Sequence, residues 1–334
     1  MKTIAVIGAG AISESFHLPA LRRSPRDLTI LLVDPDQDRA LEVAKRFGIE
    51  FVFPNHRDVL DRADAAVIAS PHHTHVAIAT DFVDAGLPVL SEKPLGTTLS
   101  EVATLEELSN SKGVTVAVNQ TRRFIPACAE IRDIIRRGEL GDSVKLQAIE
   151  GDKFGWPAAT PSMFGARSAG KGVLLDIGAH VLDLVAWWFG DDLQVVDYVD
   201  DSFGGSEAVC HVRLEGPSCE VEVRLSWIAK QSNAYVFSGG DDRIEWMVYD
   251  LDRFERTSRG GSSRTVTLAN APASFADLAP KVIEDFIVAA TSSGRPLASA
   301  SDAMASMRLI EECYARRRRF DMPWHQDQTE VNHG

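Results

Sequence analysis

Short apolar runs alternate with helical patterns along the first hundred or so residues. The runs that predict strands are apolar almost throughout: Thr3–Ile7, Leu28–Val33, Phe51–Phe53, Ala65–Ala69, Val89–Leu90 and Val114–Val118. Helical patterns fill the segments Ala11–Arg23, Asp36–Phe47, His75–Ala85 and Leu99–Asn110. Strands without polar alternation are buried on both faces, as in parallel sheets covered by crossover helices. The pattern therefore predicts an α/β domain built on a doubly wound parallel sheet.

The pattern changes after about residue 121. Polar and apolar positions alternate with period two in Val144–Glu150, Leu193–Asp200, Ala208–Leu214, Cys219–Ile228, Ala234–Ser238 and Ile244–Tyr249. Helical patterns cover Pro126–Arg137, Asp176–Phe189, Leu278–Thr291 and Ser301–Arg318. We expect residues 1–121 to form the first domain and residues 122–334 an α+β domain with a large open, mostly antiparallel sheet. The last helix, 301–318, is a candidate to pack back on the first domain.

Composition and charge narrow the classes of partner. The chain has 334 residues, of which 45% are hydrophobic and 25% charged, as in soluble globular proteins of about two domains. A net charge of −13 disfavours nucleic acid and anionic lipid, which attract Lys and Arg. We expect no membrane span, because no apolar run approaches the roughly 20 residues required. Four scattered cysteines fit neither a zinc site nor a disulfide framework, and so fit a reducing cytoplasm.

A glycine-rich turn follows the first strand. In Gly8-Ala9-Gly10-Ala11-Ile12-Ser13, the first glycine permits a tight turn and the second lets the backbone approach a pyrophosphate at the helix N-terminus. Asp34 ends the second strand, where a carboxylate accepts hydrogen bonds from the adenosine ribose and repels a 2′-phosphate. We therefore expect NAD rather than NADP. Alternatively, the glycines and Asp34 belong to ordinary turns that hold no cofactor. Arg39 either stacks on adenine or is solvated.

Polar residues follow the fourth and fifth strands at the same predicted edge of the sheet, where ligands bind in open α/β folds. Ser70-Pro71-His72-His73-Thr74-His75 holds three histidines but lacks the acidic ligands of a metal site, so we expect no metal and place His75 near the cofactor. Ser91-Glu92-Lys93-Pro94 places a charged pair between a buried strand and a proline. Lys93 is either part of a surface ion pair or a donor to the substrate oxygen beside the nicotinamide.

A third polar group interrupts an otherwise apolar helix. Asp176 is placed to cap this helix, His180 lies four residues further on and Asp183 three beyond that, so all three share one face. A histidine in such a helix is usually a satisfied core residue. Two flanking acids favour a catalytic role, because a carboxylate can orient an imidazole and stabilise its charged form.

These motifs together resemble those of the glucose–fructose oxidoreductase / inositol 2-dehydrogenase / MocA (Gfo/Idh/MocA) family, and the resemblance covers nearly the whole chain. It rests on Gly8–Ser13, His17–Leu21, Ser70-Pro71, His75, Glu92-Lys93-Pro94, Asn119 and Asp176–His180. The resemblance implies a Rossmann domain followed by an open, mostly antiparallel α/β domain. It also implies NAD(P)-dependent oxidation or reduction of a secondary alcohol or ketone on a sugar, nucleotide sugar or cyclitol such as inositol.

The resemblance also implies roles for individual residues. It implies that Lys93 and His180 form the catalytic pair and that Asp176 assists by orienting His180. It also implies a cis Lys93–Pro94 peptide bond, which is often found in the family. The predicted cofactor contacts are Gly8, Gly10, Ala11, Ile12, Asp34, Arg39, Ser70, Pro71, His72, His75, Glu92, Lys93 and Asn119. The predicted substrate contacts are Arg123, Trp156, Asp176 and His180.

Two other functions fit the same motifs. One is an NAD-dependent glycoside hydrolase that uses a transient oxidation, and the other is a non-catalytic regulator that senses a dinucleotide. Arg122 and Arg123 either bind an anionic group of the substrate or begin a solvated helix, and Trp156 either stacks on a sugar or packs in the core. The resemblance implies a homodimer or homotetramer, and we expect an apolar face of the second domain's sheet to form its interface.

Overall fold

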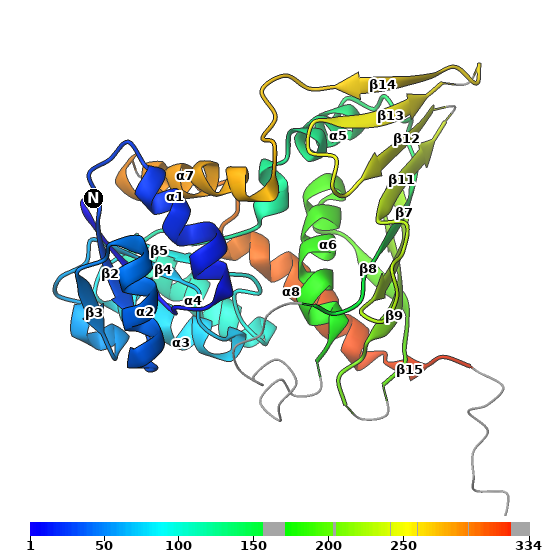
Figure 1. Ribbon diagram of the computed structural model, residues 1–334. Coiled ribbons are helices and arrows are strands. Elements are labelled where there is room, and N and C mark those ends of the chain that lie inside the picture. Colours follow the sequence, from blue (N-terminus) through cyan, green and yellow to red (C-terminus); the bar gives the residue numbers. More distant parts are fainter. Residues whose placement is uncertain (156–170, 203–204, 241, 259, 293, 322–334) are drawn as a thin grey trace, which may run out of the picture.

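The N-terminal sheet has six parallel strands in the order β3-β2-β1-β4-β5-β6. Its strands are β1 Thr3–Ile7, β2 Thr29–Val33, β3 Phe51–Phe53, β4 Ala65–Ile68, β5 Val89–Ser91 and β6 Val116–Val118. The crossover helices are α1 Leu18–Arg23, preceded by a π-helical turn at Ser13–His17, α2 Gln37–Phe47, α3 His75–Asp84 and α4 Leu99–Lys112. The computed structural model describes residues 1–155, 171–202, 205–240, 242–258, 260–292 and 294–321. The predicted doubly wound Rossmann fold is confirmed, and Figure 1 shows it at the left.

The second sheet is a mixed sheet of nine strands in the order β14-β13-β12-β11-β7-β10-β9-β8-β15. The strands are β7 Val144–Gly151, β8 Gln194–Asp200, β9 Val209–Gly216, β10 Cys219–Ser226, β11 Ala234–Gly239, β12 Asp242–Met247, β13 Arg253–Thr257, β14 Ser263–Thr267 and β15 Arg318–Arg319. Most neighbours are antiparallel, but β7 pairs with β10, and β8 with β15, in parallel. The predicted open, mostly antiparallel sheet is confirmed.

Helices α5 Pro126–Arg136, α6 Val173–Phe189 and α8 Ala300–Ala315 lie between the two sheets (Figure 1). A continuous apolar core joins residues of the first sheet to α6, α8 and the second sheet, with Ile68, Val181 and Leu309 among its members. Helix α8 packs on α4 as well as on α6, so the last helix does reach the first domain. We keep the boundary near residue 121 as a proposal, because β6 ends at Val118 and β7 begins at Val144.

Helix α7 (Ala279–Ser292) belongs to the first domain by its contacts, although it comes late in the chain. It lies beside α1 (Figure 1), and its buried side chains pack with β1 and α1 in a second apolar core that includes Ile4, Leu21 and Phe286. The sequence pattern assigned all of residues 122–334 to the second domain. The apolar face of α7 has the same spacing whichever sheet it covers, so this placement could not be predicted from its pattern.

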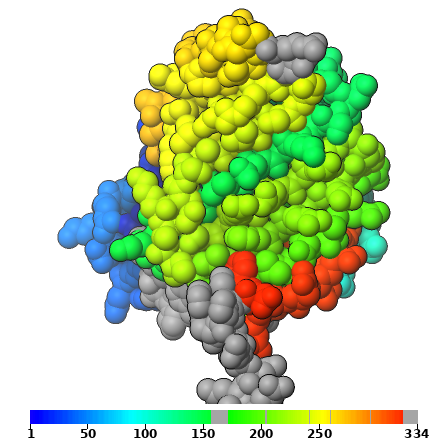
Figure 2. Space-filling model, turned by 90° about the vertical axis from the view of Figure 1, so that its right-hand side faces the viewer, coloured from blue at the N-terminus to red at the C-terminus, as the bar shows by residue number. Residues whose placement is uncertain are grey.

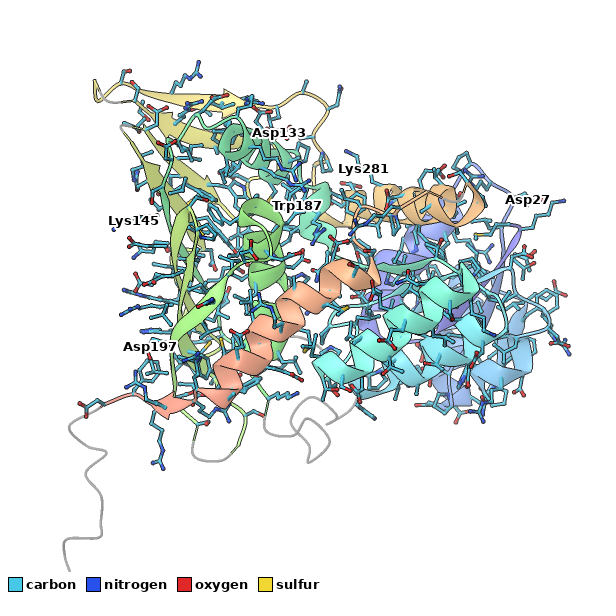
Figure 3. The ribbon with its side chains drawn as sticks, turned by 180° about the vertical axis from the view of Figure 1, so that it is seen from behind. Asp27, Asp133, Lys145, Trp187, Asp197 and Lys281 are labelled. Carbon is cyan, nitrogen blue, oxygen red and sulfur yellow. The ribbon has the colours of Figure 1, made fainter. Side chains whose placement is uncertain are left out.

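The outer face of the second sheet is charged, and this contradicts the expected apolar face. Figure 2 looks onto this face, which β7 crosses as a blue-green band. Figure 3 shows Lys145 pointing away from the helices, whereas Trp187 lies on the helical side. The exposed outward residues are mainly ionic: Lys145, Arg213, Glu215, Glu220, Arg224 and Arg243. Apolar residues such as Leu146 and Val212 alternate with them and face the helices, so this sheet buries one face only.

Candidate functional site

The glycine turn has the shape that a dinucleotide requires. Gly8 adopts φ +108°, and a Cβ there would lie 2.5 Å from the carbonyl oxygen of Ala69, so only glycine fits. A Cβ at Gly10 would meet nothing within 4 Å, which leaves open space above the backbone. The hydroxyl of Ser13 donates to the carbonyl of Gly8 at 2.6 Å and holds the helix start against the strand. The turn therefore fits a pyrophosphate group at Gly10.

Asp34 lies at the end of β2, and its carboxylate is only 4% exposed. Oδ2 accepts from the backbone N–H of Ala9 at 2.8 Å, and Oδ1 accepts from the N–H of Asp36 at 2.9 Å. Arg39 donates to the same Oδ1 at 2.8 Å, so its guanidinium lies on the carboxylate and is not solvated away from it. Asp34 thus joins the glycine turn to the start of α2, at the position where an adenosine ribose would lie.

His75 joins the ends of β4 and β5. Its ring is fully buried, with Nδ1 2.8 Å from the carbonyl oxygen of Pro94 and Nε2 2.7 Å from that of Ser70. His72 precedes it, and burial, together with the charges of His75 and Lys93, lowers the pKa of His72 to about 3. Both histidines are therefore neighbours of the Lys93 loop, although only His72 is partly exposed.

Glu92 is the centre of a buried polar network. Its Oε1 lies 2.8 Å from Nε2 of His17 and accepts from the amide of Asn119 at 2.7 Å. Burial opposes ionisation, but the hydrogen bond and charge of His17, the amide of Asn119 and the charge of Lys93 together lower the pKa of Glu92. The sequence offered His17 only as part of a motif. Its signal was a histidine between the apolar residues Phe16 and Leu18, which by itself does not identify a partner.

Lys93 crosses from the first domain to the second. Its ammonium donates to Oδ1 of Asp176 at 2.7 Å and to the carbonyl of Asp176 at 3.2 Å, with both side chains mostly buried. Burial opposes ionisation of Asp176, but the charge and hydrogen bond of Lys93 lower its pKa. The Lys93–Pro94 bond is cis, as expected. The ends of β5 and α6 therefore meet through a charged hydrogen bond.

The N-terminus of α6 is capped by Glu207 and not by Asp176 as predicted. Oε1 of Glu207 accepts from the N–H groups of Gly172 and Leu174 at 2.9 and 3.0 Å. A Cβ at Gly172 would lie 2.0 Å from the carbonyl oxygen of Glu207, so only glycine allows this approach. This frees the Asp176 side chain, in the first helical turn, for Lys93.

His180 lies one helical turn beyond Asp176 and is half-buried. Burial lowers the pKa of His180 well below its ordinary value, and the charges of Lys93 and Arg122 lower it further. Its Nδ1 is buried and has no hydrogen-bond partner among the described residues. Neither acid orients this imidazole as the sequence suggested, because Asp176 binds Lys93 and Asp183 binds Arg123. The ring is held neutral, so it is able to accept a proton.

Arg123, a predicted substrate contact, is bound by acidic groups of the protein itself. It is 4% exposed and donates from Nε and Nη2 to the two carboxylate oxygens of Asp183 at 2.9 and 2.8 Å. Nη1 also donates to Asp302 at 3.0 Å and to the carbonyl of Leu297 at 3.1 Å. Arg123 thereby ties α6 to the start of α8. Trp156, the other predicted substrate contact, lies outside the described residues.

The charge of Arg122 reaches the site, although the predicted substrate contacts named Arg123 and not Arg122. It donates from Nη2 to Glu150 at 2.8 Å and from Nη1 to the hydroxyl of Tyr235 at 3.2 Å, and its Nη1 also contacts Glu150. Tyr235 in turn donates to Glu150. The charge of Arg122 acts on both Asp176 and His180. The sequence signal that could have identified this pair was Glu150, an acidic residue at a position of β7 that faces the helices.

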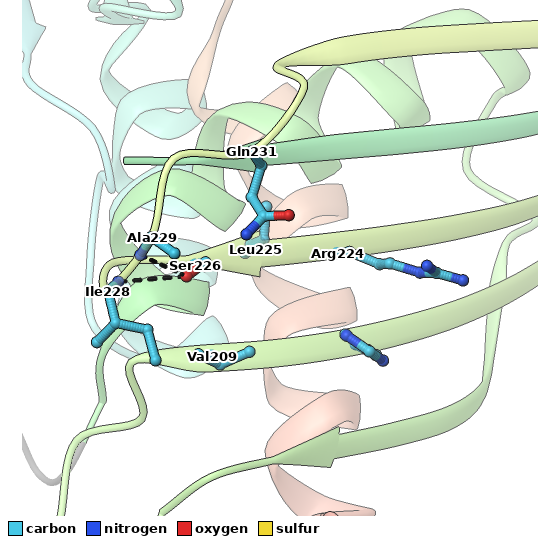
Figure 4. A pocket seen from close by; sticks show the side chains of 8 residues that line it. Val209, Arg224, Leu225, Ser226, Ile228, Ala229 and Gln231 are labelled. Atoms are coloured by element: carbon cyan, nitrogen blue, oxygen red, sulfur yellow. Dashed lines mark hydrogen bonds between the residues drawn. The ribbon is translucent and has the colours of Figure 1, made fainter. Parts of the chain in front are cut away.

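A surface hollow lies elsewhere, on the second sheet. It has a volume of about 320 Å³ on the outer side of β9 and β10, and Val209, Arg224, Ile228 and Gln231 are among its lining residues (Figure 4). Within the described ranges no three His, Cys, Asp or Glu side chains are grouped to hold a metal ion. The same residues contain no helix that is both long and apolar enough to cross a membrane.

Comparison with known proteins agrees with this arrangement. Residues 2–120 match the model of the oxidoreductase family with an NAD-binding Rossmann fold, and residues 128–245 match the GFO/IDH/MocA C-terminal domain. The chain is 27% identical over 306 residues to the rhizopine catabolism protein MocA of Rhizobium meliloti, covering 81% of this chain and 91% of that protein. It is 31% identical over 197 residues to inositol 2-dehydrogenase 1 of Saccharopolyspora erythraea, covering 57% of this chain and 55% of that protein.

Among solved structures, levoglucosan dehydrogenase in complex with NADH and levoglucosan superposes with a TM-score of 0.83 at 20% identity. That match covers 94% of this chain and 96% of the other, and at this identity it shows the shared fold alone. The two family models together span most of the chain and meet at the junction of the two sheets. The chain therefore belongs to the GFO/IDH/MocA family of NAD(P)-dependent sugar and cyclitol oxidoreductases.

Proposed function

We propose that this enzyme transfers a hydride between NAD and a carbon that bears a secondary hydroxyl or a ketone, on a sugar or a cyclitol. The observation that carries the proposal is the interdomain pair of Lys93 and Asp176 beside the neutral His180. When bound, NAD⁺ supplies the hydride acceptor, so that oxidation of an H–C–O–H group gives C=O, NADH and one proton. A cation and a neutral base at one oxygen are the groups that this proton transfer needs.

Each polar side chain has a separate part in the proposed reaction. Neutral His180 accepts the hydroxyl proton in oxidation and returns it in reduction. Lys93 donates a hydrogen bond to the same oxygen and stabilises its developing negative charge. Asp176 fixes the Lys93 ammonium through two hydrogen bonds, to its carboxylate and to its backbone carbonyl. This differs from the role that the sequence suggested, because Asp176 acts on Lys93 and not on His180.

The cofactor is proposed to lie along the carboxyl edge of the first sheet. Gly8, Gly10, Ala11 and Ile12 would hold the pyrophosphate, Asp34 would accept the ribose hydroxyls, and the loops at Ser70–His72 and Glu92–Lys93 would border the nicotinamide. Asp34 favours NAD, because a buried carboxylate repels a 2′-phosphate. Arg39 already pairs with Asp34 and so offers a phosphate only part of its charge.

A direct test is to supply NAD with a panel of sugars, cyclitols and glycosides while following both NADH and sugar release. The proposal predicts stoichiometric NADH from at least one polyol. Sugar release without net NADH would instead favour the NAD-dependent hydrolase. Dinucleotide binding with neither product, across nucleotide sugars as well, would favour a sensor. The comparisons name dehydrogenases and lend no support to these two alternatives.

We propose that the chain self-associates through the outer face of the second sheet, by charged contacts and not by the apolar contacts that the sequence suggested. Opposite charges face each other across strands on the outer face, as in the pairing of Lys145 with Glu220 at 2.8 Å. A two-fold contact between such faces would be polar and therefore weakened by salt. Light scattering at low and high ionic strength should find a dimer or tetramer that dissociates as salt rises. A monomer at low salt and micromolar concentration would contradict it.

A further inference from the structure

Glu207 is a buried acid to which the proposed reaction gives no part. It lies between β8 and β9, and its side chain is 0% exposed. Its Oε1 accepts from the N–H groups of Gly172 at 2.9 Å and Leu174 at 3.0 Å, and from the hydroxyl of Tyr314 at 2.8 Å. Its backbone carbonyl accepts the N–H of Val173 at 2.9 Å. One residue thus satisfies three consecutive N–H groups at the start of α6, which carbonyls within the helix cannot reach.

The second carboxylate oxygen of Glu207 has a different partner. Oε2 accepts from Nη2 of Arg317 at 2.8 Å, and Nε of Arg317 lies 2.6 Å from Oδ2 of Asp200. Arg317 follows the end of α8, and Asp200 is the last residue of β8. Oε1 therefore carries the helix cap and Oε2 carries the ion pair, so that substitutions can separate the two.

The helix start that Glu207 holds is bound to the first domain on both sides. Just before it, the ammonium of Lys171 donates to the carbonyl of Thr97. Just after it, Asp176 accepts from the ammonium of Lys93 through its carboxylate at 2.7 Å and its backbone carbonyl at 3.2 Å. Lys93 and Thr97 both belong to the segment between β5 and α4. The position of this helix start therefore decides where the Lys93 ammonium is held.

We propose that Glu207 is a positioning residue for hydride transfer, which holds the start of α6 so that Asp176 fixes Lys93 at the reacting oxygen. The inference rests on the proposed function and adds a residue that acts on the reaction through others. An uncapped first turn would let Asp176 move, and displacement of a catalytic group by about 1 Å can lower a rate by about 10²-fold. A cap needs an oxygen acceptor facing the N–H groups, so the positioning depends on Oε1 and not on the ion pair with Arg317.

The test compares Glu207→Ala with Arg317→Met. The first removes both the cap and the ion pair, and the second is its matched control because it removes the same ion pair and leaves the cap on Oε1. The single-turnover rate of hydride transfer is measured at saturating NAD and a polyol that the wild type oxidises, together with NAD affinity and melting temperature. We expect Glu207→Ala to transfer hydride about tenfold more slowly or worse, with NAD affinity within about twofold of the wild type. Arg317→Met should lose stability but keep its rate within about threefold.

The conservative variant Glu207→Gln separates the cap from the charge in the same side chain. Its amide oxygen can replace Oε1 as the acceptor, whereas its amide nitrogen cannot accept from Arg317. We expect a rate near that of the wild type together with a lower melting temperature. A merely structural role would make the rate follow stability in all three variants. A wild-type rate in folded Glu207→Ala, or an equal loss of rate in Arg317→Met, would overturn the inference.

If Glu207→Ala does not fold, Tyr314→Phe takes its place. This variant removes only the hydroxyl that donates to Oε1, so the weakened cap should lower the rate by about threefold. An unchanged rate in folded Tyr314→Phe would then overturn the inference. The proposed function is judged on the wild type alone. If no polyol yields NADH, the proposed function fails and the inference fails with it, whereas hydride transfer at one rate in the wild type and the cap variants removes the inference only.

Discussion

Replacing Arg123 with methionine separates the structural role of this residue from a role in substrate binding. Methionine keeps a flexible apolar side chain of similar length but supplies no donor. The change removes two hydrogen bonds to Asp183, one to Asp302 and one to the carbonyl of Leu297. Asp183 is only 1% exposed, so its carboxylate would remain buried without its cation.

Breaking a buried ion pair by removing one partner costs about 3–5 kcal/mol. For a chain of this size each kcal/mol lowers the melting temperature by roughly 2–4 °C, so we expect a loss on the order of 10 °C. The loss should grow with pH. Burial already raises the pKa of Asp183 despite Arg123, and without Arg123 it rises further. A carboxyl whose pKa is higher in the folded state stabilises the fold only while it is protonated, so the deficit increases as the pH rises above about 4, the ordinary pKa of an aspartate.

The assay is thermal unfolding at several pH values, together with kcat/KM per folded molecule below the melting transition. The control Arg224→Met removes an exposed partner of Glu222 and should change stability by at most about 1 kcal/mol. We expect Arg123→Met to lose stability while its folded fraction keeps near-normal kcat/KM. A variant with the wild-type melting temperature but a large rise in KM would refute the reasoning and return Arg123 to the substrate site.

Two further predictions concern cofactor choice and pH. Asp34→Ala removes the carboxylate that would accept the ribose hydroxyls and leaves Arg39 to the longer pairing with Asp36 at 3.9 Å, so the ratio of NAD to NADP affinity should fall. Titration with both cofactors checks this, and equal or better NADP affinity in the wild type would contradict it. Burial and the charges of Lys93 and Arg122 lower the pKa of His180 well below 6.5. Hence kcat/KM for oxidation should stay level from about pH 8 to about pH 6.5 and fall only when His180 becomes protonated, whereas a decline centred above pH 6.5 would argue against His180 as the base.

The local pattern of the chain predicted both sheets, because burial on two faces and on one face produce different periodicities. The sequence pattern did not predict strands β13 and β14. They form an edge hairpin, and Phe254 is the only buried residue of these two strands, so Arg253–Thr257 and Ser263–Thr267 show no apolar alternation.

The site was predicted less completely than the fold. Motif spacing identified Lys93, Asp176 and His180, but the partner of each charge depends on long-range contacts that spacing does not encode. The sequence placed Asp176 and Asp183 on one helical face with His180, and that is where they lie. It could not show that one acid would bind Lys93 and the other Arg123, because both cations lie far away in the chain, one after β5 and the other in the 3-10 turn Thr121–Phe124.

The most direct test of the proposed chemistry is the single-turnover rate of hydride transfer in His180→Ala, measured with its NAD affinity and melting temperature. Loss of a positioned general base should lower the rate by about 10²–10⁴-fold. NAD affinity should stay nearly unchanged, and because His180 is half-buried with Nδ1 unpartnered within the described residues, the melting temperature should fall little. A folded His180→Ala enzyme that transfers hydride at a near-normal rate would contradict the catalytic assignment and the function built on it.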